Sequence, residues 1–195
     1  MSSLTAGLNW MHTSLGSRMY PEAPVHKNIA ISDIANGLAL ICRYGGQGDV
    51  YKFYSVAEHS VLMAQYALED AGSFAAMYVL LHDASEAYLG DLVPAVKNAV
   101  GSSYAVLEDA IMNDIMRKYS AHHDFRDYAK TIDRRIVPTE KAALMRHPQP
   151  WPSDAADPLP VGIECWRPVE AKMRFLSMWE DLRQMNGLPD EDWEI

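Results

Sequence analysis

The sequence predicts an all-α protein that folds as one compact domain. Apolar residues make up 49% of the 195 residues and charged residues 22%, a balance typical of a globular chain with a core. Apolar side chains recur at helical spacing through most of the chain, and no segment sustains the alternation of a strand. A chain of this length usually forms one unit, so we expect a single domain over 1–195, with its core at about 30–145.

Start and stop signals place the helices of the first half. A helix at about 34–43 follows Ser32-Asp33 and ends before Gly45-Gly46. The next begins at Ser55 and runs to about residue 70, because Ser55 and Glu58 have the spacing of a capping box. Further helices are expected at about 74–88 and 103–119.

The second half contains two more expected helices, separated by a loop. The helix at about 125–145 contains Pro138, which should kink or split it. Residues 147–160 are rich in proline and form a loop, and a last helix at 168–186 begins at Pro168, a favoured first position. Its apolar side chains form one stripe: Val169, Met173, Leu176, Trp179 and Leu182. Residues 9–20 should be irregular or a short extended piece.

Charge and cysteine content exclude several classes of protein. The formal net charge of −9 disfavours nucleic-acid polymers and anionic membranes as partners. The two cysteines, Cys42 and Cys165, are too far apart in sequence for a zinc knuckle and too few for a disulfide scaffold. The chain has no apolar stretch of about 20 residues, and residues 1–7 do not resemble a secretory signal. We therefore expect a cytoplasmic protein.

Histidines and carboxylates gather at positions that should be buried. His59 shares a helix face with apolar residues, and His82-Asp83 directly follow the apolar run 77–81. A single such histidine is usually a core residue bonded to a carbonyl, but an adjacent buried carboxylate is costly unless it is paired or binds a metal. Glu86, at helical spacing from both residues, would lie on the same side of the helix. The cluster indicates a site.

The residue types in this cluster suit a metal ion. Imidazole nitrogens and carboxylate oxygens together favour a first-row divalent transition metal such as cobalt, zinc or manganese. A further ligand must come from another helix, and Asp133, beside apolar Ile132 and Ile136, is the candidate. An ion pair between Asp133 and a neighbouring arginine is the alternative.

The order of these residues, His59, then His82-Asp83, then Asp133, resembles the signature of the HD-domain metal-dependent phosphohydrolases. Segments 55–60 (SVAEHS) and 82–97 (HDASEAYLGDLVPAVK) are similar to the bacterial 5′-deoxynucleotidases. Segments 9–11 (NWM), 41–46 (ICRYGG) and 53–55 (FYS) are more similar to the phage-type dATP triphosphohydrolases. The resemblance covers about 9–145 and implies the helical HD-domain fold.

The resemblance also implies a role for each matching residue. His59, His82, Asp83 and Asp133 would bind the metal, which would activate a water molecule and polarise a phosphoryl oxygen. Glu86 would act as acid and base, Asp91 would orient the water or the phosphate, and four residues would contact the substrate: Arg43, Tyr44, Lys97 and Lys130. The Gly45-Gly46-Gln47 segment departs from the Gly-Gly-His of many phage-type relatives, which affects base and sugar selectivity.

We therefore expect a phosphohydrolase that removes phosphate from 2′-deoxynucleotides, foremost dATP and its lower phosphates, and so depletes dATP from the nucleotide pool. A broad 5′-deoxynucleotidase acting on monophosphates is one alternative, and a non-catalytic nucleotide-binding HD module is another. The partner would be a small deoxynucleotide. The acidic surface and the apolar stripe of the last helix suggest a homo-oligomer, located in the bacterial host cytoplasm if a phage encodes it.

Overall fold

The protein is all-α, as predicted, apart from one short hairpin. The computed structural model describes residues 9–24 and 26–190, so the expectation for residues 1–7 lies outside it. Strands β1 (Met11–His12) and β2 (Arg18–Met19) pair antiparallel, with Met11 opposite Met19. This hairpin is the extended piece expected within 9–20. Of the helices in the described part of the chain, none is long and apolar enough to cross a bilayer.

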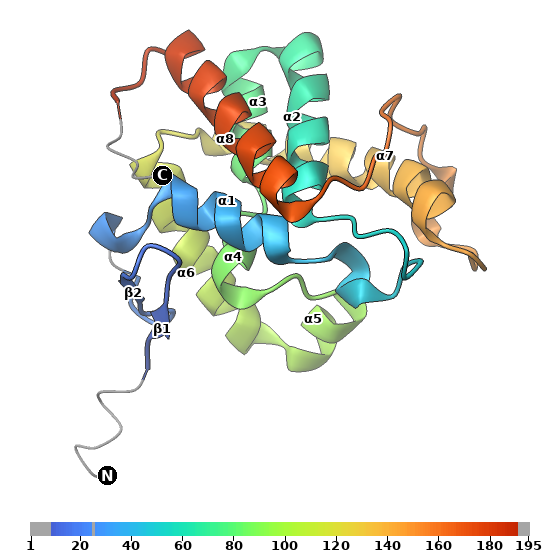
Figure 1. Cartoon of the computed structure of the whole chain (residues 1–195), viewed down its shortest axis with the longest axis horizontal. Helices are drawn as coiled ribbons and strands as arrows, with labels where there is room; N and C mark the ends of the chain where they lie inside the picture. Colours follow the sequence, from blue (N-terminus) through green and yellow to red (C-terminus); the bar gives the residue numbers. More distant parts are fainter. Residues whose placement is uncertain (1–8, 25, 191–195) are drawn as a thin grey trace.

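The expected helices follow one another in the expected order, and a further helix at 94–100 was not predicted (Figure 1). The helices are α1 (Ile31–Leu40), α2 (Val56–Ala71), α3 (Ser73–Leu81), α4 (Glu86–Leu89), α5 (Pro94–Val100), α6 (Ser102–Lys118), α7 (Arg126–Leu144) and α8 (Pro168–Met185). Short 3₁₀ turns cover His26–Asn28, Arg43–Gly46, His123–Phe125 and Pro152–Ala155.

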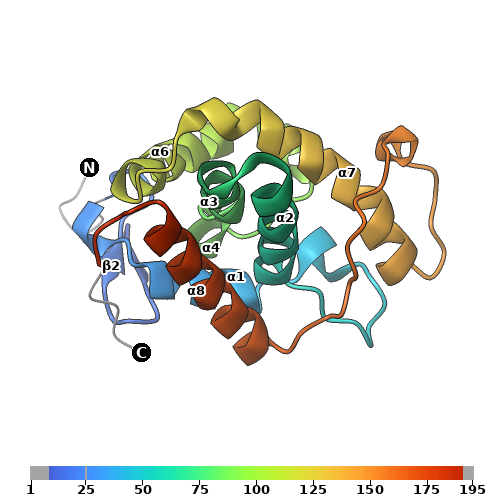
Figure 2. The same cartoon turned by 90° about the horizontal axis from the view of Figure 1, so that it is seen from above.

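Helices α2 and α3 form the centre of the molecule. Figure 2 shows them between α1 and α8 on one side and α6 and α7 on the other. Every residue from 75 to 81 is buried, which explains why this stretch of α3 is apolar on all sides. Because α2 and α3 are enclosed, polar side chains at their ends reach the interior of the protein.

The expected helix at 74–88 is interrupted. Helix α3 ends at Leu81, and residues 82–85 form turns before α4 begins at Glu86. In this segment the N–H of Ala84 donates to the Leu81 carbonyl and that of Glu86 to the Asp83 carbonyl, the three-residue pattern of a tighter helix. His82 and Asp83 therefore lie in a tight turn, and the expectation that they share one α-helical side with Glu86 was wrong.

Two expectations for the second half of the chain are also corrected. Of the kink or split expected at Pro138, the split does not occur, because α7 continues through Pro138 as one helix. On α8, the face that packs against the core contains Phe175, Trp179 and Leu182, whereas Val169 and Met173 are 69% and 57% exposed. The predicted stripe is therefore mostly core and does not form a continuous free surface for oligomer contacts.

The predicted capping box at the start of α2 forms only in part. The N–H of Glu58 donates to Ser55 Oγ at 3.1 Å, as expected. The Glu58 side chain, however, accepts from the N–H groups of Glu164 and Cys165, both at 2.9 Å, and of Trp166 at 2.7 Å. This buried carboxylate thus ties the segment before α8 to the first turn of α2.

The contact between α1 and α4 depends on Gly37. A Cβ at this position would lie 2.8 Å from the Cβ of Ala87 and 2.9 Å from its Cα. We expect Gly37→Ala to lower the free energy of unfolding by about 1–3 kcal/mol, because overpacking outweighs the better helix propensity of alanine. Urea denaturation measures the change. The control Leu40→Ala, at a 60% exposed position of the same helix, should change it by less than about 0.5 kcal/mol. A gain in stability for Gly37→Ala would contradict this packing.

Candidate metal centre

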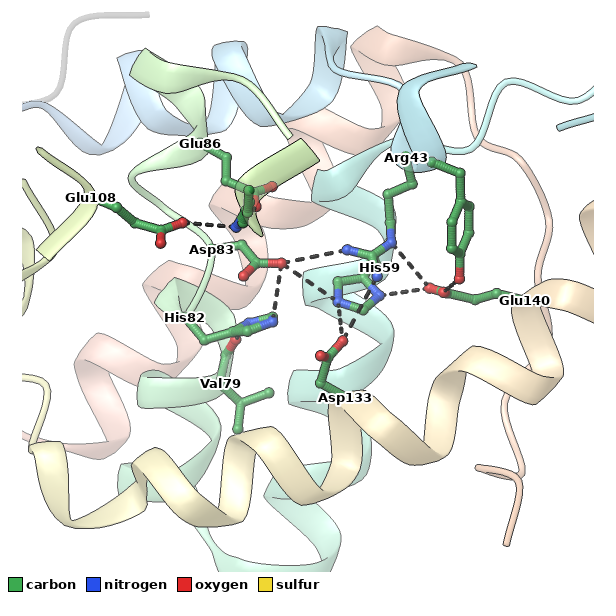
Figure 3. Close-up of polar contacts among 11 residues, drawn as sticks. Arg43, His59, Val79, His82, Asp83, Glu86, Glu108, Asp133 and Glu140 are labelled. Atoms are coloured by element: carbon green, nitrogen blue, oxygen red, sulfur yellow. Dashed lines mark hydrogen bonds and ion pairs between the residues drawn. The ribbon is translucent and has the colours of Figure 1, made fainter. Parts of the chain in front are cut away.

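Four of the predicted site residues meet at the centre of the molecule. His59 lies in the first turns of α2, His82 and Asp83 in the turn after α3, and Asp133 in α7. One potential ligand atom from each of His59, His82 and Asp133 lies within 4.8 Å of the others, so the group can hold a metal ion. Asp83 Oδ2 lies 3.1 Å from His82 Nε2 and 3.7 Å from His59 Nε2, and Figure 3 shows the side chains converging.

The two imidazoles are oriented as metal ligands require. His82 Nδ1 lies 2.6 Å from the Val79 carbonyl, which can only accept, so Nδ1 carries the proton. His59 Nδ1 lies 2.6 Å from Glu140 Oε1 and donates to it in the same way. Each Nε2 is left buried and without a hydrogen-bond partner, facing the carboxylates of the cluster. Bonding of the second ring nitrogen is typical of metal-binding histidines, so the donor set fits a divalent ion.

Glu140 is a residue of the centre that sequence reasoning missed. It is fully buried in α7, and the pKa of its carboxyl is lowered to about 2, because Arg43 and His59 outweigh the effect of burial, which acts in the opposite direction. Glu140 follows Asp133 by seven residues, which is two helical turns. Its spacing from Asp133, which puts both carboxylates on the same face of the helix, was the pattern in the sequence that could have identified Glu140.

Arg43 lies among the carboxylates of the centre. Its Nη1 is 3.4 Å from Asp83, its Nη2 3.7 Å from Asp133 and its Nε 3.5 Å from Glu140. These pairs compensate the buried negative charge, and they raise the pKa of Arg43 although burial acts to lower it. The geometry places Arg43 in contact with two of the proposed ligands.

Tyr44 lies on the outer side of Glu140. Its hydroxyl donates to Glu140 Oε2, and its ring centroid is 5.6 Å from that of Trp151. Its backbone has φ of 59°, an uncommon conformation for a residue other than glycine. Both Arg43 and Tyr44 were expected to contact substrate, and in the structure both contact Glu140.

The proton affinity of the centre follows from this packing. Burial and Arg43 act to lower the pKa of His59, but Glu140 and Asp133 outweigh them and raise it to about 9. The pKa of Asp83 is lowered despite burial, chiefly by His82, and that of Asp133 by His59. Without a metal ion, His59 therefore carries a proton at neutral pH.

Glu86 and Asp91 lie beside the ligands. Glu86 is 3% exposed, its Oε2 has no hydrogen-bond partner, and burial together with Asp83 and Asp91 raises its pKa to about 9. Burial also raises the pKa of Asp91. Glu86 therefore holds its proton at neutral pH, and a positive ion at the neighbouring ligands would lower its pKa toward the range in which a carboxyl group both donates and accepts a proton.

A cavity of about 230 Å³ adjoins the centre, and His82, Asp83 and Asp133 form part of its wall. The predicted substrate contacts Lys97 and Lys130 line it, and so does Arg126, which sequence reasoning did not single out. Arg43 and Tyr44 are not among its lining residues. The cavity thus combines the candidate metal ligands with cationic side chains.

The role of Glu140 can be tested by metal binding. Glu140→Gln removes the carboxylate that orients His59, so we expect Mn²⁺ affinity to fall by about 10- to 100-fold while the chain stays folded. Competition with a chromophoric chelator measures the affinity, and circular dichroism checks the fold. Glu170→Gln, at an exposed position of α8, is the matched control and should bind metal like the unchanged protein. Equal affinity in both variants would refute the role of Glu140.

Comparison with known proteins identifies relatives. No family model matches the sequence. Over 105 residues the chain is 39% identical to an uncharacterized protein of Rhodobacter capsulatus, which covers 52% of this chain and 54% of that protein. Over 137 residues it is 32% identical to the uncharacterized protein YfdR of Escherichia coli K12, covering 70% of this chain and 73% of YfdR. The chain thus matches about half the length of the first relative and nearly three quarters of the second, and it belongs to the same family as YfdR.

Proposed function

We propose that this protein is a cytoplasmic, divalent-metal-dependent phosphohydrolase of the HD-domain type that acts on 2′-deoxynucleotides, foremost dATP. The observation that carries the proposal is the convergence of His59, His82, Asp83 and Asp133, with both Nε2 atoms directed at the carboxylates. Lys130 and Arg126 line the adjoining cavity beside the carboxylates of Glu108 and Asp109, and they offer positive charge to a phosphate ester. The resemblance of segments 55–60 and 82–97 to deoxynucleotidases supports the same reaction.

Each residue of the centre has a distinct task in this reaction. A divalent metal held by the four ligands would supply a Lewis acid for the phosphoryl group and lower the pKa of water. A divalent cation at the neighbouring ligands would lower the raised pKa of Glu86, so that Glu86 can exchange a proton with the attacking water, and Asp91 orients that water. Arg43 holds Asp83 and Asp133 in place, and Glu140 does the same for His59. Lys130, at the cavity, offsets negative charge on the phosphate.

A broad 5′-deoxynucleotidase is the second candidate. The cavity of about 230 Å³ is smaller than the 300–1,000 Å³ typical of small-molecule pockets, which favours a monophosphate. A non-catalytic nucleotide-binding module would not need an acid–base group, and Glu86 is present and buried beside the ligands. The two enzymatic candidates differ in their preferred substrates, and the non-catalytic module would form no product, so one assay separates all three.

The assay compares Asp83→Ala and Glu86→Gln with the unchanged protein on dATP, dADP, dAMP and the other deoxynucleotides, in Mn²⁺, Co²⁺ or Zn²⁺. We expect Asp83→Ala to lose both metal and activity, and Glu86→Gln to retain metal but lose at least about 100-fold in kcat. Phosphate release and metal analysis measure the two effects. Asp181→Ala, at an exposed position of α8, is the control. Full activity of metal-stripped protein would refute the proposal, and nucleotide binding without turnover would indicate the non-catalytic module.

Metal binding should depend on pH in a defined direction. Because metal-free His59 has a pKa of about 9, a metal ion must displace its proton at neutral pH. We expect the apparent Mn²⁺ affinity to rise by up to about tenfold per pH unit between pH 6.5 and 8.5, with release of about one proton per ion at pH 7. Calorimetry in buffers of different ionisation enthalpy measures both quantities. An affinity that does not change with pH would contradict a protonated His59.

A further inference from the structure

We propose that the face of α7 between its first residue, Arg126, and Asp133 binds the polyphosphate chain of a deoxynucleoside triphosphate. Arg126 on this face distinguishes triphosphates from monophosphates. This inference rests on the proposed function and concerns substrate selection at the same site. Its basis is the order of three side chains along one helix: Arg126, Lys130 and Asp133 all line the cavity.

Helical geometry sets the spacing of these side chains. Residues 126, 130 and 133 are separated by four and three positions, so they follow one another on the same face of α7. At a rise of about 1.5 Å per residue, Lys130 lies about 4.5 Å and Arg126 about 10.5 Å along the axis from Asp133. A phosphate at the metal ligands, with further phosphates extending toward the start of α7, would therefore pass first Lys130 and then Arg126.

The competing cation of the cavity is already neutralised. Lys97 Nζ lies 2.8 Å from Glu108 and 3.3 Å from Glu86, and these carboxylates raise its pKa although burial acts to lower it. These contacts indicate that Lys97 holds the buried carboxylate of Glu86 in place. To bind a phosphate, Lys97 would have to break its ion pairs with both Glu86 and Glu108. The ion pairs of Arg126 and Lys130 on α7 are longer, at 3.7 and 3.9 Å, than those of Lys97.

Among the described residues, Arg126 and Lys130 form weak, exposed ion pairs. Arg126 Nη2 lies 3.7 Å from Asp109, and Lys130 Nζ lies 3.9 Å from Asp127. The two cationic side chains are 58% and 64% exposed, and ion pairs of this kind contribute little to stability. Both side chains can therefore turn to an anion, and the guanidinium of Arg126 can bind a phosphate through two N–H groups.

This placement also reconciles the small cavity with a large substrate. The phosphate chain would lie along the exposed rim formed by Arg126 and Lys130, and only the remainder of the nucleotide needs the enclosed volume. A monophosphate would reach the metal ligands without contacting Arg126. Loss of Arg126 should therefore affect the two substrates unequally.

The test measures kcat/KM for dATP and dAMP in Arg126→Gln, Arg126→Lys and the unchanged protein with metal bound. We expect Arg126→Gln to lower the value for dATP by about tenfold or more and that for dAMP by less than about twofold. Arg126→Lys, which keeps the charge, should recover part of the loss. Arg134→Gln, at an exposed position of α7 outside the cavity lining, is the control. An equal loss on both substrates, or no loss on dATP, would overturn the inference.

A binding measurement separates this inference from the proposed function. Binding of dATP and of dAMP is measured with Mn²⁺ in excess over protein and nucleotide, in the Glu86→Gln background, which is expected to bind metal without turnover. If the kinetic assay detects no hydrolysis, the proposed function fails, but weaker binding of the triphosphate alone when Arg126→Gln is added still supports the polyphosphate site. Unchanged binding of dATP on addition of Arg126→Gln would refute the site even if the protein is an active enzyme.

Discussion

The arrangement of the centre depends on a buried imidazole held between carboxylates. His59 is fully buried, with Glu140 2.6 Å from Nδ1 and Asp133 3.3 Å from Nε2. Buried charges are costly unless each has a partner, so the surrounding residues must compensate one another. Arg43 supplies the positive charge and Tyr44 the hydrogen bond that Glu140 still lacks. These ion pairs and hydrogen bonds hold the proposed ligands in an arrangement that could bind a divalent cation.

The sequence predicts those parts of the centre that local patterns reveal. His59, His82 and Asp83 were identified because polar residues in apolar runs are unusual. The structure brings the two histidines together with Asp133 in a group that could hold an ion, and Asp83 lies next to both imidazoles. The helix boundaries follow caps, glycines and prolines, so most were predicted to within a few residues. The turn at 82–85 was not, because an apolar run followed by helix-forming residues gives no local sign of a break.

Contacts between distant segments explain the remaining differences. Arg43 and Tyr44 were assigned to substrate by resemblance, but their partner Glu140 is about a hundred residues away along the chain. Lys97 was also assigned to substrate by resemblance, and its partner Glu108 lies on another helix. On α8, spacing alone gave an apolar stripe, but which part of that face is buried depends on α1, α2 and α3. In each case the sequence shows the side chain and not its partner.

The hydrogen bonds of Glu58 extend the functional unit toward the C-terminus. Glu58 directly precedes His59, and its carboxylate holds the three amides of residues 164–166. A fragment cut near residue 145, where the family resemblance ends, would leave this buried carboxylate without its donors at the base of a ligand-bearing helix. The smallest fragment that keeps this centre intact must therefore include the segment before α8 and α8 itself, so truncations should be designed beyond residue 185.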